Sequence, residues 1–289
     1  TRAMAAWICM QVKFGVHVFL VGDPAQSIYG FRGADANYVQ QFVFPEGVIV
    51  NRCSLSVSYR FGPDLAAVAN TVCFAKSHSP QGQDGPGDSF RLVGGSSEPT
   101  VVTTKSLLIP EEWNKEPVVF IARSNATLIT TAINLLVEHK DAPPRMKMIG
   151  EGEHAGKNKF RKTFTHLHSF YEVYMASVAE TPRQVFLRHP EFTECGRVSW
   201  QMVCEHVEQA DLVELKTTIM LVNTFGAQTT EYAALFEDAC LDDRNDDAEP
   251  QVIFVTGHGA KGGQWGRVIV ANDMISIGSF MVSRSPGGA

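Results

Sequence analysis

Four short runs of apolar residues along the chain each end at a glycine or at a group of polar residues. The runs are residues 16–21 (VHVFLV), 118–122 (VVFIA), 252–256 (VIFVT) and 267–270 (RVIV). A continuous apolar run of this length, bounded by turn residues, is typical of a strand that is covered on both faces. Residues 145–150 (RMKMIG) predict a shorter strand, and residues 48–50 and 53–60 have strand-like patterns.

Helical periodicity fills the intervals between these runs. In residues 61–75 (FGPDLAAVANTVCFA), Leu65, Val68, Ala69 and Val72 recur at intervals of three and four. Pro63 suits a first helical position. A helix is also predicted over residues 126–139, directly after the second apolar run, and a short one over residues 34–42. Strands that alternate with helices indicate a parallel α/β sheet.

The middle of the chain, residues 150–249, is helical in pattern and poorer in buried strands. One apolar stripe at helical spacing predicts a helix that packs against a core. The stripe consists of Phe160, Phe164, Leu167, Tyr171 and Tyr174. Residues 237–250 (EDACLDDRNDDAEP) contain seven acidic residues and a proline, which predicts a solvated linker.

Composition limits the classes of protein that remain. The chain has 289 residues with a formal net charge of −6, so bulk charge does not attract it to nucleic acid and any such site must be a local patch. No apolar run is long enough to span a bilayer. The six scattered cysteines form no CxxC pair, as is typical of an intracellular protein with reduced thiols. The spacing of Cys195, Cys204 and His206 fits no zinc pattern, so we expect no metal there.

Polar clusters follow three of the predicted strands. They are residues 22–33 (GDPAQSIYGFRG), 123–125 (RSN) and 256–265 (TGHGAKGGQW). Ligands of open α/β sheets bind at the carboxyl ends of the strands. Three such clusters at equivalent positions therefore predict a shared crevice.

The first cluster combines groups that suit phosphate and bases. Gln26 offers an uncharged donor and acceptor to a phosphate oxygen or a water. Tyr29 and Phe31 point the same way in extended backbone and present faces on which bases stack, and Arg32 suits a phosphate or a base edge. An isolated pair of this kind is also consistent with core aromatics beside a surface cation.

The ordered series of motifs resembles the UvrD/Rep-type superfamily 1 helicases. GDPAQSIYGFRGA resembles their third motif, LSVSYRFGPDLAAVAN their fourth, and VTGHGAKGGQWGRVIVAND their fifth. VFIARSNA resembles the strand that carries a DNA-contacting asparagine. The forms YRFGPDLAAVAN, RLVGG and RMKMIGEG resemble most the F-box DNA helicase branch.

The resemblance implies a role for each matching residue. Gln26 would sense the γ-phosphate, Arg60 would reach it as an arginine finger, and Gln264 occupies the place of a glutamate that meets the nucleotide sugar. Single-stranded DNA would be contacted by Tyr29, Phe31, Arg32, Asn125, Thr256, His258 and Lys261. Taken alone, His258 is equally consistent with an ordinary loop histidine.

The chain departs from this family in the motifs that bind ATP and Mg²⁺. It contains no GxxxxGK[ST] sequence, and GEGEHAGKN at residues 150–158 has the wrong spacing. The Asp-Glu box and the last Arg-bearing motif are also missing, so we expect the main ATP and Mg²⁺ ligands upstream, in a longer protein. Gly263 stands where the family has leucine, and Gln264 where it has glutamate.

The expected fold is a RecA-like, P-loop NTPase-type α/β sheet. We expect the end of lobe 1A over residues 1–47, lobe 2A over 48–150 and 251–289, and a helical 2B-like insertion with its acidic linker over 151–250. The expected function is that of an ATP-dependent 3′–5′ DNA helicase, in repair or recombination, acting on single strands and their junctions with duplex. The chain alone is expected to be inactive as an ATPase.

Further expectations and alternatives follow from the resemblance. The F-box branch implies a nuclear protein with ubiquitin-ligase subunits as partners, if an F-box lies upstream, whereas a bacterial relative would be cytoplasmic. Two alternatives stay open. One is a non-catalytic module that binds single-stranded DNA or a partner, and the other is a damaged gene product without a stable fold.

Overall fold

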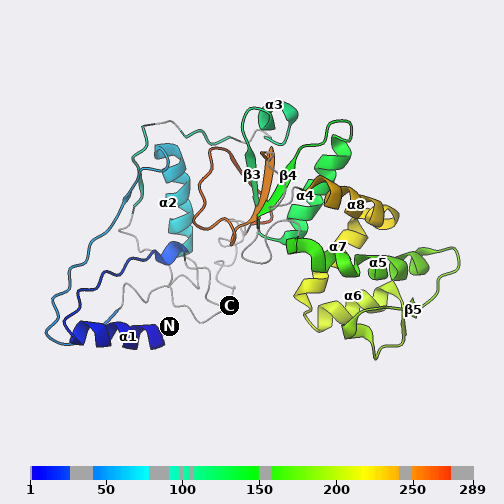
Figure 1. Ribbon diagram of the computed structural model, residues 1–289, viewed down its shortest axis with the longest axis horizontal. Helices are drawn as coiled ribbons and strands as arrows, with labels where there is room; N and C mark the ends of the chain where they lie inside the picture. The colour runs from blue at the N-terminus through cyan, green and yellow to red at the C-terminus, as the bar shows by residue number, and fades with distance from the viewer. Residues whose placement is uncertain are drawn as a thin grey trace, which may run out of the picture. The chain divides into compact units, whose positions relative to one another are not determined.

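The chain divides into two compact units in the computed structural model (Figure 1), and each is described here by itself. One unit contains residues 1–104 and 275–289, and the other contains residues 105–274. The structure describes residues 2–26, 42–77, 91–97, 100–103, 107–149, 158–240 and 249–274. The helix predicted over residues 34–42 therefore lies almost entirely outside the described residues, as do Tyr29, Phe31 and Arg32.

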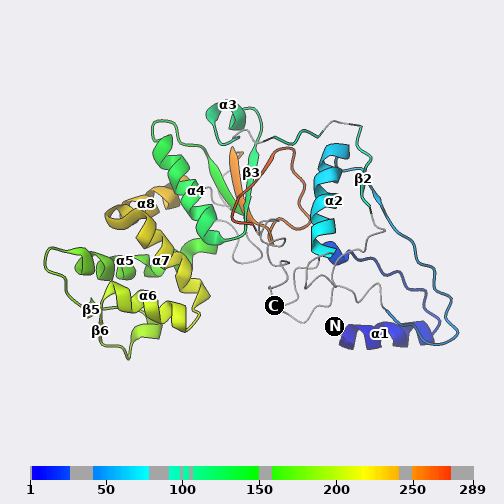
Figure 2. The ribbon, with the colours of Figure 1, turned by 180° about the vertical axis from the view of Figure 1, so that it is seen from behind.

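The described part of the first unit contains two α-helices and a short strand pair. Its elements are α1 (Arg2–Lys13), the 3-10 turn η1 (Pro24–Gln26), β1 (Val57–Ser58), α2 (Pro63–Ser77) and β2 (Val93–Gly94), with β2 labelled in Figure 2. The helix predicted to start at Pro63 is confirmed. The side-chain amide of Asn70 on α2 donates to Leu92 O at 2.9 Å and accepts from Leu92 N at 2.8 Å, so α2 holds the RLVGG segment, which contains β2.

The strand prediction for residues 16–21 is wrong. No strand is assigned over residues 16–23 or 48–50, and Phe19 is 96% exposed. A strand with apolar side chains on both faces needs neighbouring strands for its hydrogen bonds and other elements packed against each face. The described part of this unit supplies neither, since its only strands are the two-residue pair β1 and β2.

The second unit contains the parallel sheet that the sequence predicts. Its strands are β3 (Val118–Ala122), β4 (Met146–Ile149), β7 (Val252–Thr256) and β8 (Val268–Val270), in the order β4-β7-β3-β8. Every pairing in this sheet is parallel. A mixed α/β fold with such a sheet is consistent with a RecA-like helicase fold.

Helix α4 (Asn125–Glu138) buries one face against this sheet. Leu128, Ile129, Ile133 and Leu136 are fully buried, and they follow the spacing that places side chains on one side of a helix. Figures 1 and 2 show α4 beside the strands, with α7 and α8 beyond it. The core therefore extends from the sheet through α4 into the helical part of the chain.

The helical middle of the chain is inserted between β4 and β7, which are hydrogen-bonded neighbours. It contains α5 (Asn158–Val178), β5 (Val185–Phe186), η5 (Pro190–Phe192), β6 (Arg197–Val198), α6 (Trp200–Gln209), α7 (Val213–Phe225), η6 (Gly226–Gln228) and α8 (Thr229–Ala239). The predicted helical character is confirmed. Of the predicted apolar stripe of α5, Leu167 is buried and Phe164 and Tyr174 pack against the core. Phe170 and Val173 are fully buried as well, and the side chain of Phe160 lies outside the described residues.

The acidic stretch predicted as a linker begins inside a helix. Residues 237–239 belong to α8, and Cys240 is buried and forms a β-bridge with Met146. Residues 241–248 lie outside the described part of the chain. The solvated-linker prediction is therefore wrong for its first residues, because α8 must reach the sheet before the chain enters β7.

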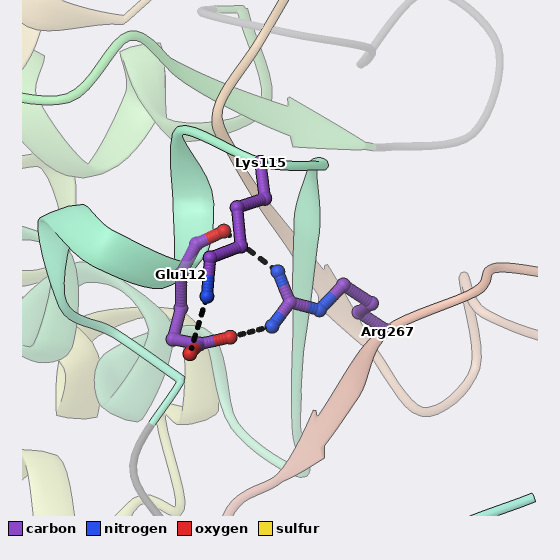
Figure 3. Close-up of polar contacts among 3 residues, drawn as sticks. All are labelled: Glu112, Lys115 and Arg267. Atoms are coloured by element: carbon purple, nitrogen blue, oxygen red, sulfur yellow. Dashed lines mark hydrogen bonds and ion pairs between the residues drawn. The ribbon is translucent and has the colours of Figure 1, made fainter.

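An ion pair secures the amino end of the sheet. Arg267, just before β8, donates through Nη1 to Glu112 O at 2.6 Å and pairs through Nη2 with the Glu112 carboxylate (Figure 3). Lys115 Nζ lies 3.1 Å from Glu112 Oε1. These contacts hold the short helix α3 (Pro110–Trp113) at the end of the sheet opposite to the strands' carboxyl ends.

Candidate functional site

The carboxyl ends of β3 and β7 lie side by side in the second unit. Ala122 is the register partner of Thr256, and Gly257 N donates to Ala122 O at 2.9 Å. The segments that follow these strands, residues 123–125 and 257–263, therefore leave the sheet at one edge. We call them the edge loops. Two of the three predicted polar clusters thus meet as expected.

The first edge loop turns directly into α4. Ser124 has an extended backbone, and its Oγ accepts from Thr127 N at 3.1 Å, so it caps the helix. Asn125 is the first residue of α4 and is exposed. Its amide is displayed at the helix start, where unsatisfied backbone N–H groups also favour an anionic ligand.

The second edge loop is a series of tight turns. Thr256 Oγ1 accepts from Gly259 N at 3.2 Å, and Thr256 O accepts from Ala260 N at 2.8 Å. Gly262 has φ +84°, a backbone conformation that favours glycine. The side chains of His258, Lys261 and Gln264 are exposed. The hydroxyl of Thr256 therefore shapes the loop that displays them.

Trp265 occupies the space beside Gly263. A Cβ built on Gly263 would collide with the six-membered ring of Trp265. The indole therefore lies directly against Gly263 and leaves no room there for a side chain. A larger residue at position 263 would have to displace the ring.

Asp273 joins the end of β8 to the first edge loop. Its Oδ1 accepts from Arg123 N at 2.9 Å, and its Oδ2 accepts from Ser124 N at 3.1 Å and from Ser124 Oγ at 3.3 Å. Burial opposes the charge, but donors from Arg123, Thr127 and Ser124 outweigh it and lower the pKa of Asp273 below its usual value. Sequence reasoning missed this residue, although RVIVAND places an aspartate at the end of a predicted strand.

This lowered pKa predicts how stability depends on pH. A depressed folded-state pKa contributes stability above the unfolded value of about 3.9, and that contribution disappears as the pH falls through the folded value. We expect Asp273→Asn to lower the free energy of unfolding by about 1 kcal/mol at neutral pH, with the difference closing in acid. Urea unfolding of the unmodified chain and of the Asp273→Asn variant, from neutral pH to about pH 3, measures this difference in free energy. A difference that is constant with pH would contradict the assignment.

In the first unit, Gln26 and Arg60 are both exposed. The Asp23 carboxylate accepts from Gln26 Nε2 at 2.6 Å and from Ala25 N at 2.9 Å. It therefore holds the side-chain amide of Gln26 through the nitrogen and does not use the amide oxygen. Arg60 lies in the turn between β1 and α2, where its backbone N–H donates to Ser58 Oγ at 3.4 Å. Both side chains suit contact with a phosphate group.

These residues fit only the margin of a nucleotide site. Among the described residues, no group of three or more His, Cys, Asp or Glu side chains is arranged to hold a metal ion. Asn125, Thr256, His258, Lys261 and Gln264 belong to one unit, whereas Gln26 and Arg60 belong to the other.

No helix in the described ranges is long and apolar enough to cross a membrane.

Comparison with known proteins gives matches at two levels. Residues 2–43 match the family model described as the UvrD/REP helicase N-terminal domain. Over 260 residues, 89% of this chain, the sequence is 26% identical to F-box DNA helicase protein 1 of Schizosaccharomyces pombe. Over 271 residues, 90% of this chain, it is 25% identical to F-box DNA helicase 1 of Gallus gallus. The chain spans only 26% and 22% of the length of these relatives. No solved structure matches it.

Proposed function

Because this chain belongs to the UvrD-like superfamily 1 helicases, in the branch of the F-box DNA helicases, we propose that it forms part of an ATP-dependent DNA helicase. The whole enzyme would translocate 3′ to 5′ along single-stranded DNA, in repair or recombination. Within it, this chain would contribute the end of lobe 1A and most of lobe 2A, and the segment α5–α8 would be the 2B-like insertion.

The observation that supports this proposal best is the meeting of the edge loops. They display Asn125, His258 and Lys261 from neighbouring parallel strands, at the edge where open α/β sheets bind ligands. Arg123 in the first loop is exposed as well and adds a second cation to Lys261 of the second loop. A local basic edge of this kind is what an acidic chain needs to bind a phosphate backbone.

Substitution of Lys261 tests the proposed contact with DNA. If Lys261 meets one phosphate, Lys261→Ala should reduce the slope of log affinity against log salt by about 0.7, which is roughly a fivefold loss near 0.1 M salt. Fluorescence anisotropy with a labelled oligothymidylate measures both quantities. Lys140 is an exposed lysine just beyond the other end of α4, so Lys140→Ala is the matched control and should change neither. Equal effects of the two substitutions would contradict the assigned edge.

We propose from the resemblance, residue by residue, that Gln26, Arg60 and Gln264 each contact nucleotide in the whole enzyme. ATP supplies the phosphoryl group there. The guanidinium of Arg60 would stabilise charge on it, and the Gln26 carbonyl oxygen would orient a water or phosphate partner. No further step is assigned to this chain, since it contains no GxxxxGK[ST] loop.

The chain by itself is expected to hydrolyse no ATP. Phosphate release with and without single-stranded DNA should stay at the level of the Arg60→Ala variant, because the phosphate-binding loop is absent. Hydrolysis that DNA stimulates and that Arg60→Ala abolishes would show that the chain carries its own phosphate ligands. That result would contradict the expectation.

A second candidate function is a non-catalytic module that binds single-stranded DNA. The absence of the phosphate-binding loop favours it, and the edge loops support DNA contact equally in both cases. An effect of added nucleotide on DNA binding would contradict the module. For the whole protein only, we also propose the nuclear location and the ubiquitin-ligase partners that the resemblance to the F-box DNA helicase branch implies.

A further inference from the structure

The turn that follows β8 contacts both edge loops. Asp273 accepts hydrogen bonds from two consecutive backbone N–H groups of the first loop, at Arg123 and Ser124. The next residue, Met274, has its Cε 3.5 Å from the place where a Cβ on Gly257 would lie. Asp273 and Met274, in the turn after β8, thus each lie against one of the two edge loops.

The start of α4 and the end of β8 each have a further hydrogen bond that does not involve Asp273. Ser124 Oγ already caps α4 by accepting from Thr127 N, so the helix start has its own acceptor. The backbone of β8 stays paired with β3 to its end, since Ala271 N donates to Ile121 O at 2.8 Å. What Asp273 adds is a fixed orientation of the peptides 122–123 and 123–124, which lead to Ser124 and then to Asn125.

We infer that Asp273 is a positioning residue that holds Asn125 in the orientation needed to contact a nucleic-acid strand. The inference rests on the proposed function. Two N–H donors from successive residues, bound to one carboxylate, fix the direction in which the chain enters α4. Asn125 is the next residue, so the placement of its side-chain amide depends on the direction in which the chain enters α4.

The sign of the effect separates positioning from simple charge. A carboxylate beside a phosphate-binding edge repels DNA, so removing its charge alone would tighten binding. Asp273→Asn keeps the shape of the side chain but presents an amide NH₂ to one of the two N–H donors. Positioning therefore predicts weaker binding, by about five- to tenfold, for the same substitution.

The experiment measures oligothymidylate affinity of the full chain by fluorescence anisotropy. Asp273→Asn is compared with Glu112→Gln, which also neutralises a carboxylate that ties a segment to β8, but at the opposite end of the sheet. We expect a loss for Asp273→Asn and none for Glu112→Gln. Unchanged or tighter binding by Asp273→Asn overturns the inference. If the amide variant does not fold, Asp273→Ser, with one hydroxyl acceptor, replaces it.

A double-mutant cycle distinguishes positioning from general destabilisation. If Asp273 acts through Asn125, Asp273→Asn should cost affinity in the native background and almost nothing in the Asn125→Ala background. An equal loss in both backgrounds overturns the inference. If Asn125→Ala and Lys261→Ala themselves leave affinity unchanged, the proposed function fails and the inference fails with it. If they weaken binding and Asp273→Asn does not, only the inference fails.

Discussion

Replacing both Tyr29 and Phe31 with alanine is expected to weaken binding of single-stranded DNA at least 30-fold. Each aromatic face that stacks on a base contributes about 1–3 kcal/mol, and two faces together exceed any single phosphate contact. Stacking is insensitive to salt, so the loss should persist at high salt, unlike the loss for Lys261→Ala. Anisotropy titrations over a range of salt concentrations measure both behaviours.

The control for this double substitution is an exposed aromatic elsewhere. Phe186 on β5 is 66% exposed, and Arg197 lies over its ring. Phe186→Ala removes a similar area of ring and should leave affinity unchanged. Full retention of binding by the Tyr29→Ala and Phe31→Ala double variant would show that these two rings do not form the stacking platform. The sequence interpretation of residues 22–33 would then revert to core aromatics.

Replacing Phe254 with alanine is expected to lower the free energy of unfolding of the sheet unit by about 3–5 kcal/mol. Phe254 is fully buried on β7, between β4 and β3, and its ring centroid lies 5.7 Å from that of Phe120. The whole free energy of unfolding of a typical domain is only about 5–15 kcal/mol. We therefore expect partial unfolding at 37 °C, seen as loss of far-ultraviolet circular dichroism and a lower urea midpoint.

Two companion variants define what that loss means. Phe254→Leu keeps most of the volume and should cost less than about 2 kcal/mol. Val270 on β8 is 63% exposed, so Val270→Ala should change the free energy by less than about 0.5 kcal/mol. If Phe254→Ala were no worse than Val270→Ala, the core would not be centred on β7 as the structure has it.

The local sequence pattern was sufficient to predict a strand or helix whose own residues define it. The apolar runs that became β3 and β7 are bounded by turn residues and are largely buried, as is typical of parallel strands covered on both faces. The run that became β8 is a strand as predicted, but its expected double cover is wrong, because Val268 and Val270 are exposed at the end of the strand order. Pro63 marks the start of α2 for a reason that lies within a few residues. The same rule misplaced a strand at residues 16–21, because a strand also needs neighbours that periodicity does not reveal.

The candidate site was predictable in part. The sequence places Asn125, Thr256 and His258 after strands, and the resemblance to a helicase family assigns them to one surface. Asp273 was missed because its partners, Arg123 and Ser124, lie about 150 residues earlier in the chain. The indole of Trp265 beside Gly263 was missed as well, since the sequence shows only that leucine is absent.

The sequence by itself determined the class of sheet, the helical character of the middle segment and the family, since each depends on local composition or on motifs in order. Only the tertiary structure decided that β3 and β7 are neighbours in register, and that the turn after β8 holds the loop before Asn125. Hydrogen bonds between distant segments depend on the order of strands in space. That order arises from packing of the whole core and is not written in any single stretch of residues.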